Sequence, residues 1–304
     1  MRVLRPPVFG VLLVTCVAAA TASAQAEPPI GVRAAGMGGA FTAVADDASA
    51  VFWNPAGLAS GSYLSAVVDR NTFDRDGSGL FVGLAGPPLG IAYYRTATGA
   101  LQNGRNSLVA HHAGVSLVQS IGDWGLAVGA TLKVVHATAP AGESANKFDL
   151  DVGVMKAGAL GRIGLAVRNL LAPEFGAADD RVRLERRIRA GASLSITDAV
   201  RIAADVDVTK ASTPRGKWRD AALGVEDALS SRAWIRAGVH WNTARLRRSA
   251  SAGQAGETSG AGAAPIASIG GSYALRGSLL ADAQASVGSR NGERGWGVGL
   301  RFVF

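Results

Sequence analysis

Cysteine is almost absent from this chain of 304 residues, which holds a single one, Cys16. It lies in residues 1–26, which have the pattern of a secretory signal peptide: a basic start, a short apolar run, and small-x-small sites for cleavage after Ala24 or Ala26. Thr15 makes Cys16 a poor lipidation site. The mature chain is therefore expected to hold neither a disulfide nor a thiolate metal site.

Long hydrophobic runs are also absent. After residue 26 no segment offers the roughly 18 consecutive apolar residues of a membrane helix. Yet the mean hydropathy is +0.19, although aromatic residues make up only 6% of the chain and glycine accounts for 40 residues. A high mean hydropathy without a long apolar run is expected when apolar residues occupy every second position of many strands, as in a membrane β-barrel. A soluble periplasmic β-sandwich is the alternative.

Alternation favours the barrel. In residues 124–136 the even positions are mostly large and apolar, whereas the odd ones are mostly small or polar, among them Thr131 and Lys133. Residues 200–208 and 294–304 follow the same pattern. Side chains of a strand alternate between its two faces, and these segments are long enough to cross a bilayer at a tilt.

Fourteen such segments are expected, which predicts an all-β fold, a fourteen-stranded antiparallel transmembrane β-barrel over residues 62–304. Short links follow the even segments, and mostly longer links follow the odd ones. This rhythm is typical of outer-membrane barrels, which have short periplasmic turns and longer outer loops. The expected strands are 62–70, 79–85, 89–96, 107–119, 124–137, 147–156, 161–169, 187–196, 200–209, 218–226, 232–242, 265–275, 279–288 and 294–304.

The polar face of these strands carries charges of both signs, and it is expected to line the lumen. Opposite charges on neighbouring strands can pair, so we expect them to line water and to anchor whatever fills the barrel. The predicted lumen-lining residues are Lys133, Asp149, Asp151, Arg162, Arg168, Arg201, Asp205, Asp207, Arg236 and Arg301, with Arg189 and Asp282 on the same face.

Residues 27–61 precede the first strand and lack its alternation. Small residues such as Gly38 and Gly39 would let this segment pack closely inside a lumen of this size. Asp46 and Asp47 would accept hydrogen bonds from amides or pair with lumen arginines. Pro55 favours a turn at Asn54. The segment is therefore predicted to be a hatch that plugs the barrel.

The stretch RAAGMGGAFTAVADDASAVFWNPAGLA, residues 33–59, resembles the N-terminal hatch of FadL-type outer-membrane transport proteins. It also resembles the related PorV/PorQ-type barrels, which are associated with protein secretion. The FadL resemblance implies a fourteen-stranded barrel plugged by the hatch, from which apolar substrate leaves sideways through the wall. It also implies a gating role for Asn54, Pro55 and Ala56.

The chain ends in an alternating strand with an aromatic residue, Phe304. This ending resembles the C-terminal signal of outer-membrane barrels, so Phe304 is a candidate assembly signal for the barrel assembly machinery. The expected location is the outer membrane of a Gram-negative cell, with lipid and lipopolysaccharide around the wall. Nucleic acid is not an expected partner of an exported barrel.

No catalytic, cofactor or metal site is predicted. The Gly-rich stretch at residues 36–39 follows no strand, so it does not fit a nucleotide site. His111 and His112 are adjacent and would face opposite sides of a strand. The segment 74–79 begins like a calcium loop but lacks the closing Glu. The chain is therefore not expected to be an enzyme.

Two functions remain open from the sequence. The first is passive transport of small hydrophobic molecules through a gated barrel. The second is a non-transporting barrel that serves as an accessory of a secretion system or as an anchor for surface proteins. An apolar space between hatch and wall that continues to a gap in the wall would favour transport, whereas a sealed, charged lumen would favour the second function.

Overall fold

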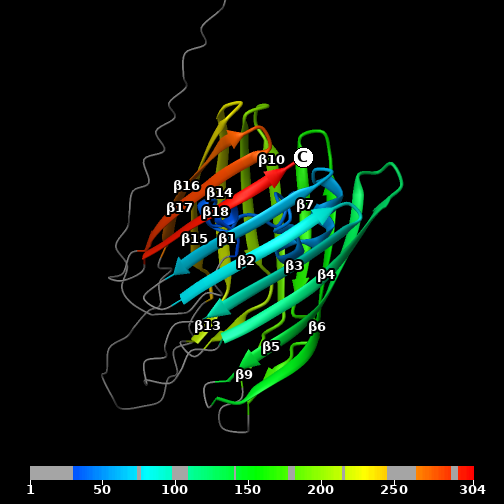
Figure 1. Ribbon diagram of the computed structural model, residues 1–304, viewed down its shortest axis with the longest axis vertical. Coiled ribbons are helices and arrows are strands. Elements are labelled where there is room, and N and C mark those ends of the chain that lie inside the picture. Colours follow the sequence, from blue (N-terminus) through cyan, green and yellow to red (C-terminus); the bar gives the residue numbers. More distant parts are fainter. Residues whose placement is uncertain are drawn as a thin grey trace, which may run out of the picture.

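The computed structural model describes residues 30–73, 77–97, 109–139, 142–176, 182–213, 216–244, 265–288 and 294–304. The predicted signal peptide lies outside these ranges. Fourteen strands form one closed antiparallel barrel (Figure 1). They are β1 (Ser65–Phe73), β2 (Gly77–Gly86), β3 (Leu89–Ala97), β4 (Val109–Ile121), β5 (Leu126–Thr138), β6 (Ser144–Ala157), β7 (Gly161–Arg168), β10 (Arg187–Ser195), β11 (Val200–Asp207), β14 (Asp220–Ser230), β15 (Ala233–Asn242), β16 (Ile266–Arg276), β17 (Leu279–Gly288) and β18 (Arg294–Val303).

Each barrel strand pairs with its neighbours along the chain, and β1 pairs with β18 to close the ring. The predicted fold class and strand number are confirmed. The largest difference at a strand end is in β14, which runs to Ser230 rather than residue 226 because a register irregularity between Ala228 and Ser230 lets pairing with β15 continue. Because the ring is closed, the sheet has no edge strand, as a sheet that crosses a membrane requires.

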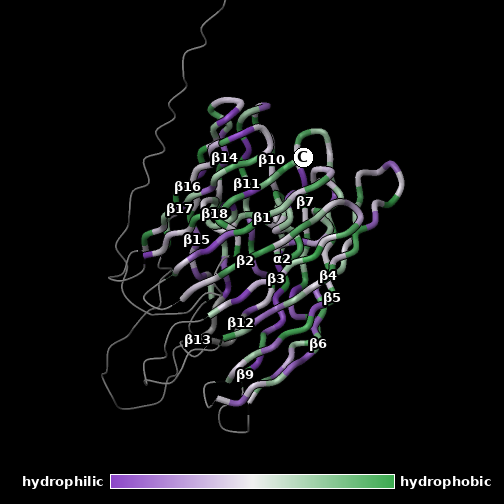
Figure 2. The backbone as a smooth tube through the Cα atoms, in the orientation of Figure 1, coloured by the Kyte–Doolittle hydropathy of each residue, from purple (hydrophilic) through white to green (hydrophobic). Residues whose placement is uncertain are grey.

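The two faces of the wall differ as the alternation predicts. On β5, Leu132 is 57% exposed, whereas Lys133 beside it is 2% exposed. Phe148 on β6 and Trp296 on β18 also face outward and are exposed. The apolar side chains therefore form the outer surface, and the polar ones face the lumen. Figure 2 shows this alternation as changes of colour along the strands.

The two ends of the barrel differ in their connections. At one end, called the turn end here, β2, β4, β6, β10, β14 and β16 are joined to the next strand by two to four residues. At the other, the loop end, two small hairpins that the sequence did not predict lie between barrel strands. They are β8 (Glu174–Phe175) with β9 (Val182–Arg183), and β12 (Ala211–Thr213) with β13 (Gly216–Trp218).

The segment before β1, residues 30–61, is called the hatch segment. It contains α1 (Val32–Gly36), α2 (Ala50–Trp53) and the 3-10 helix η1 (Pro55–Ser60). Helix α1 contacts β15 to β18 and β1, whereas η1 contacts β4 to β6 across the ring. The segment therefore lies inside the ring of strands, where Figure 1 shows it in dark blue.

Within the described residues, none of the helices has the length and apolar character needed to cross a membrane.

Candidate functional site

Wall glycines make room for the backbone of the hatch segment. Gly129, Gly153 and Gly164 face inward on β5, β6 and β7, and a Cβ on any of them would overlap Asn54 or Pro55. Asn54 uses this close approach. Its Nδ2 donates to the carbonyl oxygens of Thr42 at 3.0 Å and Val154 at 3.2 Å. The turn at Asn54-Pro55 is thus fitted to one side of the wall.

A second close approach lies on β14 and β15. A Cβ on Gly224 or Gly238 would overlap the backbone at Met37. Gly38 has a φ of 65°, which a side chain would strain, and its own Cβ would lie 2.6 Å from the amide nitrogen of Val239. The Gly-rich start of the hatch segment therefore serves both backbone conformation and close packing.

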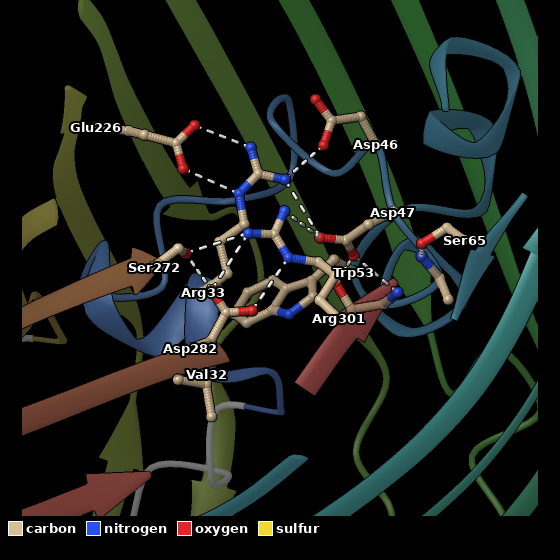
Figure 3. Close-up of polar contacts among 12 residues, drawn as sticks. Val32, Arg33, Asp46, Asp47, Trp53, Ser65, Glu226, Ser272, Asp282 and Arg301 are labelled. Carbon is tan, nitrogen blue, oxygen red and sulfur yellow. Dashed lines mark hydrogen bonds and ion pairs between the residues drawn. The ribbon is translucent and has the colours of Figure 1, made fainter. Parts of the chain in front are cut away.

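Arg33 is the centre of the polar contacts that hold the hatch segment (Figure 3). Its guanidinium forms a two-pronged pair with Glu226 of β14, with both N–O distances at 2.9 Å. Its Nη1 also donates to Asp46 at 2.5 Å and to Asp47 at 3.2 Å. Arg33 is 8% exposed, so these are largely desolvated, charge-assisted hydrogen bonds.

The carboxylates around Arg33 control its ionisation. Burial lowers the pKa of the Arg33 guanidinium, but the nearby charges of Asp46, Glu226 and Asp47 outweigh burial and hold the pKa well above its ordinary value. Arg33 is therefore positively charged in the folded barrel, and the cluster depends on that charge.

Asp46 and Asp47 reach different parts of the wall. Asp46 lies 3.8 Å from Arg162 of β7 and 3.5 Å from Arg201 of β11. Asp47 lies 3.9 Å from Arg301 of β18, and its other oxygen accepts from the amide and hydroxyl of Ser49. The acidic pair therefore connects the hatch segment to strands on both sides of the lumen.

A second anchor holds the middle of the hatch segment. Asp205 of β11 accepts hydrogen bonds from the amides of Phe41 and Thr42 at 3.1 and 2.9 Å, and from the Thr42 hydroxyl at 2.6 Å. Arg189 of β10 donates to the same carboxylate at 3.0 Å and to the carbonyl oxygen of Gly39 at 2.9 Å.

The opposite side of the hatch segment is apolar. Phe52 meets Tyr94 of β3 edge-on at 5.3 Å between ring centroids, and Phe52 also contacts Trp53. The guanidinium of Arg168 on β7 lies 4.2 Å from the Phe52 ring centroid, a cation–π distance. The hatch segment is therefore held by charge on one side and by aromatic packing on the other.

On the loop-end side of the hatch segment, Lys133 of β5 contacts β6 and the residues that follow β7. Its Nζ lies 2.8 Å from Asp151, 3.2 Å from Asp149 and 2.9 Å from Oδ1 of Asn169. The same two carboxylates accept from the amides of Asn169 at 2.8 Å and Leu171 at 3.1 Å. We call Lys133, Asp149, Asp151 and Asn169 the lysine cluster.

The predicted lumen residues Lys133, Asp149, Asp151, Arg162, Arg168, Arg201, Asp205, Asp207, Arg236 and Arg301 all project inward in the structure. Of the hatch residues, Gly38, Gly39, Asp47, Asn54, Pro55 and Ala56 are buried, and Asp46 is partly exposed. Their gating role stays a prediction, as does the role of Phe304, whose backbone pairs with Leu64.

Sequence reasoning missed Arg33 and Glu226. The signal for Arg33 was a lone charge inside a small, apolar stretch, and that for Glu226 a carboxylate near the end of an alternating strand. Among the described residues, no group of three or more side chains is arranged to hold a metal ion.

No family model and no curated protein sequence matches the chain. Solved structures do. The CymD monoaromatic hydrocarbon channel is 13% identical with a TM-score of 0.62, over 89% of this chain and 96% of that one. A FadL homologue of Pseudomonas aeruginosa is 11% identical with a TM-score of 0.63, over 91% and 99%. The Pseudomonas putida toluene transporter TodX is 12% identical with a TM-score of 0.58, over 90% and 96%.

These likenesses confirm the predicted FadL-type resemblance at the level of the fold. At such low identity they show shared architecture rather than shared substrate. The PorV/PorQ part of the resemblance stays a prediction.

Proposed function

We propose that the chain is an outer-membrane channel for passive transport of small hydrophobic molecules, with the hatch segment as its gate. The observation that carries the proposal is the way the segment is held. It is tied to the wall by ion pairs, hydrogen bonds and aromatic contacts at Arg33, Thr42 and Phe52, and it adds no strand to the ring. Such a segment can move while the wall keeps its own ladder of hydrogen bonds.

A seam between β6 and β7 supports a side exit for the substrate. In the described part of the chain, β6 pairs with β7 only through Val152–Ala157, although β6 begins at Ser144. The chain turns at Asn169, which has a φ of 54°, and Leu170 still donates its amide to the carbonyl oxygen of Leu150 on β6 at 2.9 Å. Phe148 and Leu171 beside this seam are both more than half exposed. Between Ser144 and Phe148, β6 has no pairing with β7 among the described residues, and we propose that a hydrophobic molecule passes from the lumen to the bilayer there.

The second candidate function is a non-transporting barrel that serves as a secretion accessory or an anchor. The observation that favours it is the charge of the lumen. The lysine cluster and the pairs of Arg187 and Arg189 with Asp207 are all buried. A lumen crossed by so many fixed charges is a poor path for an apolar molecule, and the lysine cluster lies at the seam itself.

Uptake of a monoaromatic hydrocarbon by cells that lack their own channel tests the proposal. Cells producing the chain should take up the hydrocarbon faster than cells with an empty vector. Phe148→Arg combined with Leu171→Arg should abolish the gain by making the seam polar. Val287→Arg is the matched control, since Val287 is also outward-facing near the loop end, on β17, with 57% exposure.

The outcomes separate the two functions. A folded wild-type barrel in the outer membrane without any gain in uptake refutes transport and leaves the accessory function. A gain that the seam variant retains keeps transport but removes the side exit.

A further inference from the structure

A row of polar side chains crosses the outer surface of four strands near the loop end. Arg95 of β3 lies opposite His111 of β4, His111 opposite His136 of β5, and His136 opposite Asn146 of β6. One step towards the turn end, the row from Tyr93 to Phe148 is largely apolar. The polar row therefore begins where the apolar outer surface ends.

From this row we infer a two-histidine site for a divalent transition metal, formed by His111 and His136. Side chains directly opposite each other on neighbouring antiparallel strands have their Cβ atoms about 5 Å apart. Imidazole nitrogens bind zinc at about 2.1 Å, so two rings on one ion have centroids no more than about 6.5 Å apart. The two ring centroids are 6.1 Å apart, within that limit.

The second nitrogen of each ring is already held, as in many metal sites. Nδ1 of His111 lies 2.7 Å from the Tyr93 hydroxyl, and Nδ1 of His136 lies 2.8 Å from Oδ1 of Asn146. Both oxygens can accept an Nδ1–H, which leaves each Nε2 with its lone pair for a metal. Outer-shell oxygens of this kind orient metal-binding histidines and raise their basicity.

Neutral imidazoles suit a metal ion better than an anion. A metal ion binds the free lone pair of a neutral imidazole, and Arg95 contributes the fixed positive charge of the row. Because only two protein ligands are present, water would complete the coordination shell. Copper(II) should bind most tightly, since it heads the affinity order for divalent ions.

Copper titration of the purified full-length barrel in detergent tests the inference. The protein must carry no polyhistidine tag, because the chain itself has only four histidines. We expect one copper(II) per chain, with an electron paramagnetic resonance spectrum that shows two imidazole nitrogens. Bound metal should also raise the unfolding temperature, because only the folded chain brings the rings together.

Three variants give the expected pattern. His111→Gln and His136→Gln should each weaken copper binding about tenfold or more and remove one nitrogen from the spectrum. Asn146→Leu should weaken copper binding about tenfold, the lower end of the range for residues that hydrogen-bond to a metal ligand. His240→Gln is the matched control, since His240 lies on the strand β15 away from the row, and it should change nothing.

Arg95 distinguishes a metal site from an anion site. Arg95→Gln should strengthen copper binding severalfold by removing a nearby positive charge, whereas it would weaken any phosphate or lipopolysaccharide bound to the row. The inference is overturned if wild type binds no copper stoichiometrically, if the glutamine variants at 111 and 136 bind as wild type does, or if Arg95→Gln weakens binding.

Discussion

Replacement of Arg33 by methionine is the sharpest test of how the hatch segment is held. Methionine keeps much of the length of the side chain and removes its charge and donors. Glu226, Asp46 and Asp47 then lose the cation that they share. Breaking a buried ion pair by removing one partner costs about 3–5 kcal/mol.

The structure favours the lower end of that range. Glu226 keeps Arg236 at 2.6 Å, and Asp46 keeps Arg201 at 3.5 Å, so neither carboxylate is left without a cation. A loss of about 3 kcal/mol corresponds to roughly a hundredfold larger population of undocked hatch, at 1.4 kcal/mol per factor of ten. The barrel wall should stay folded, because its ladder does not include Arg33.

Labelling of a buried cysteine measures this population. The mature chain is expected to lack cysteine, so Ala43→Cys would place one probe in the hatch segment, where Ala43 is fully buried. A water-soluble maleimide should react about a hundredfold faster when Arg33→Met is added, because reaction requires the hatch segment to undock.

Arg183→Met is the control. Arg183 pairs with Glu174 at 3.9 Å, with both side chains about half exposed, and such a pair contributes about 0–1 kcal/mol.

An equal labelling rate with and without Arg33→Met would refute the central role of Arg33. Glu226→Gln should raise the labelling rate by a smaller factor in Arg33→Met than in the otherwise wild-type chain, because the two side chains form one ion pair and their effects are not additive. Loss of the heat-modifiable gel mobility typical of folded barrels would instead place Arg33 in wall stability.

Three further predictions concern the wall and its assembly. Gly153→Ala should displace Asn54 and raise single-channel conductance in planar bilayers. Gly158→Ala should not raise it, because its Cβ would have only one neighbour, at 3.7 Å. Equal conductance in the two variants would show that close packing of Asn54 against Gly153 does not hold the hatch segment. Lys133→Met should lower the free energy of unfolding by about 3–5 kcal/mol in urea titrations, because Asp149 and Asp151 lose their cation. Lys147→Met, on the same pair of strands, is the control. An unchanged urea midpoint in Lys133→Met would show that the lysine cluster does not stabilise the barrel. Deletion of Phe304 should reduce the yield of folded barrel in the outer membrane, and normal yield would remove its role as an assembly signal.

Much of the wall was predictable because each of its side chains must face either the lipid or the lumen, and the two faces alternate along a strand. Lys133 could be assigned to the lumen side because a lysine facing lipid near the midplane costs about 2–4 kcal/mol, and the neighbouring strands follow by alternation. The β8–β9 hairpin could not be predicted, because each of its strands has two residues, too few to show an alternation of apolar and polar side chains. The pair between Arg33 and Glu226 spans 193 positions, and no local pattern predicts such a partner.

The contacts of the hatch segment on either side of the β1–β18 junction have a consequence for the closure of the ring. Val32 donates its amide to Asp69 of β1 at 3.2 Å, and Asp47 lies 3.9 Å from Arg301 of β18. These two strands are the first and last of the wall, and their pairing closes the ring. The hatch segment therefore contacts both strands of the pair that closes the ring, so its docking adds side-chain contacts at the junction between the first and last strands.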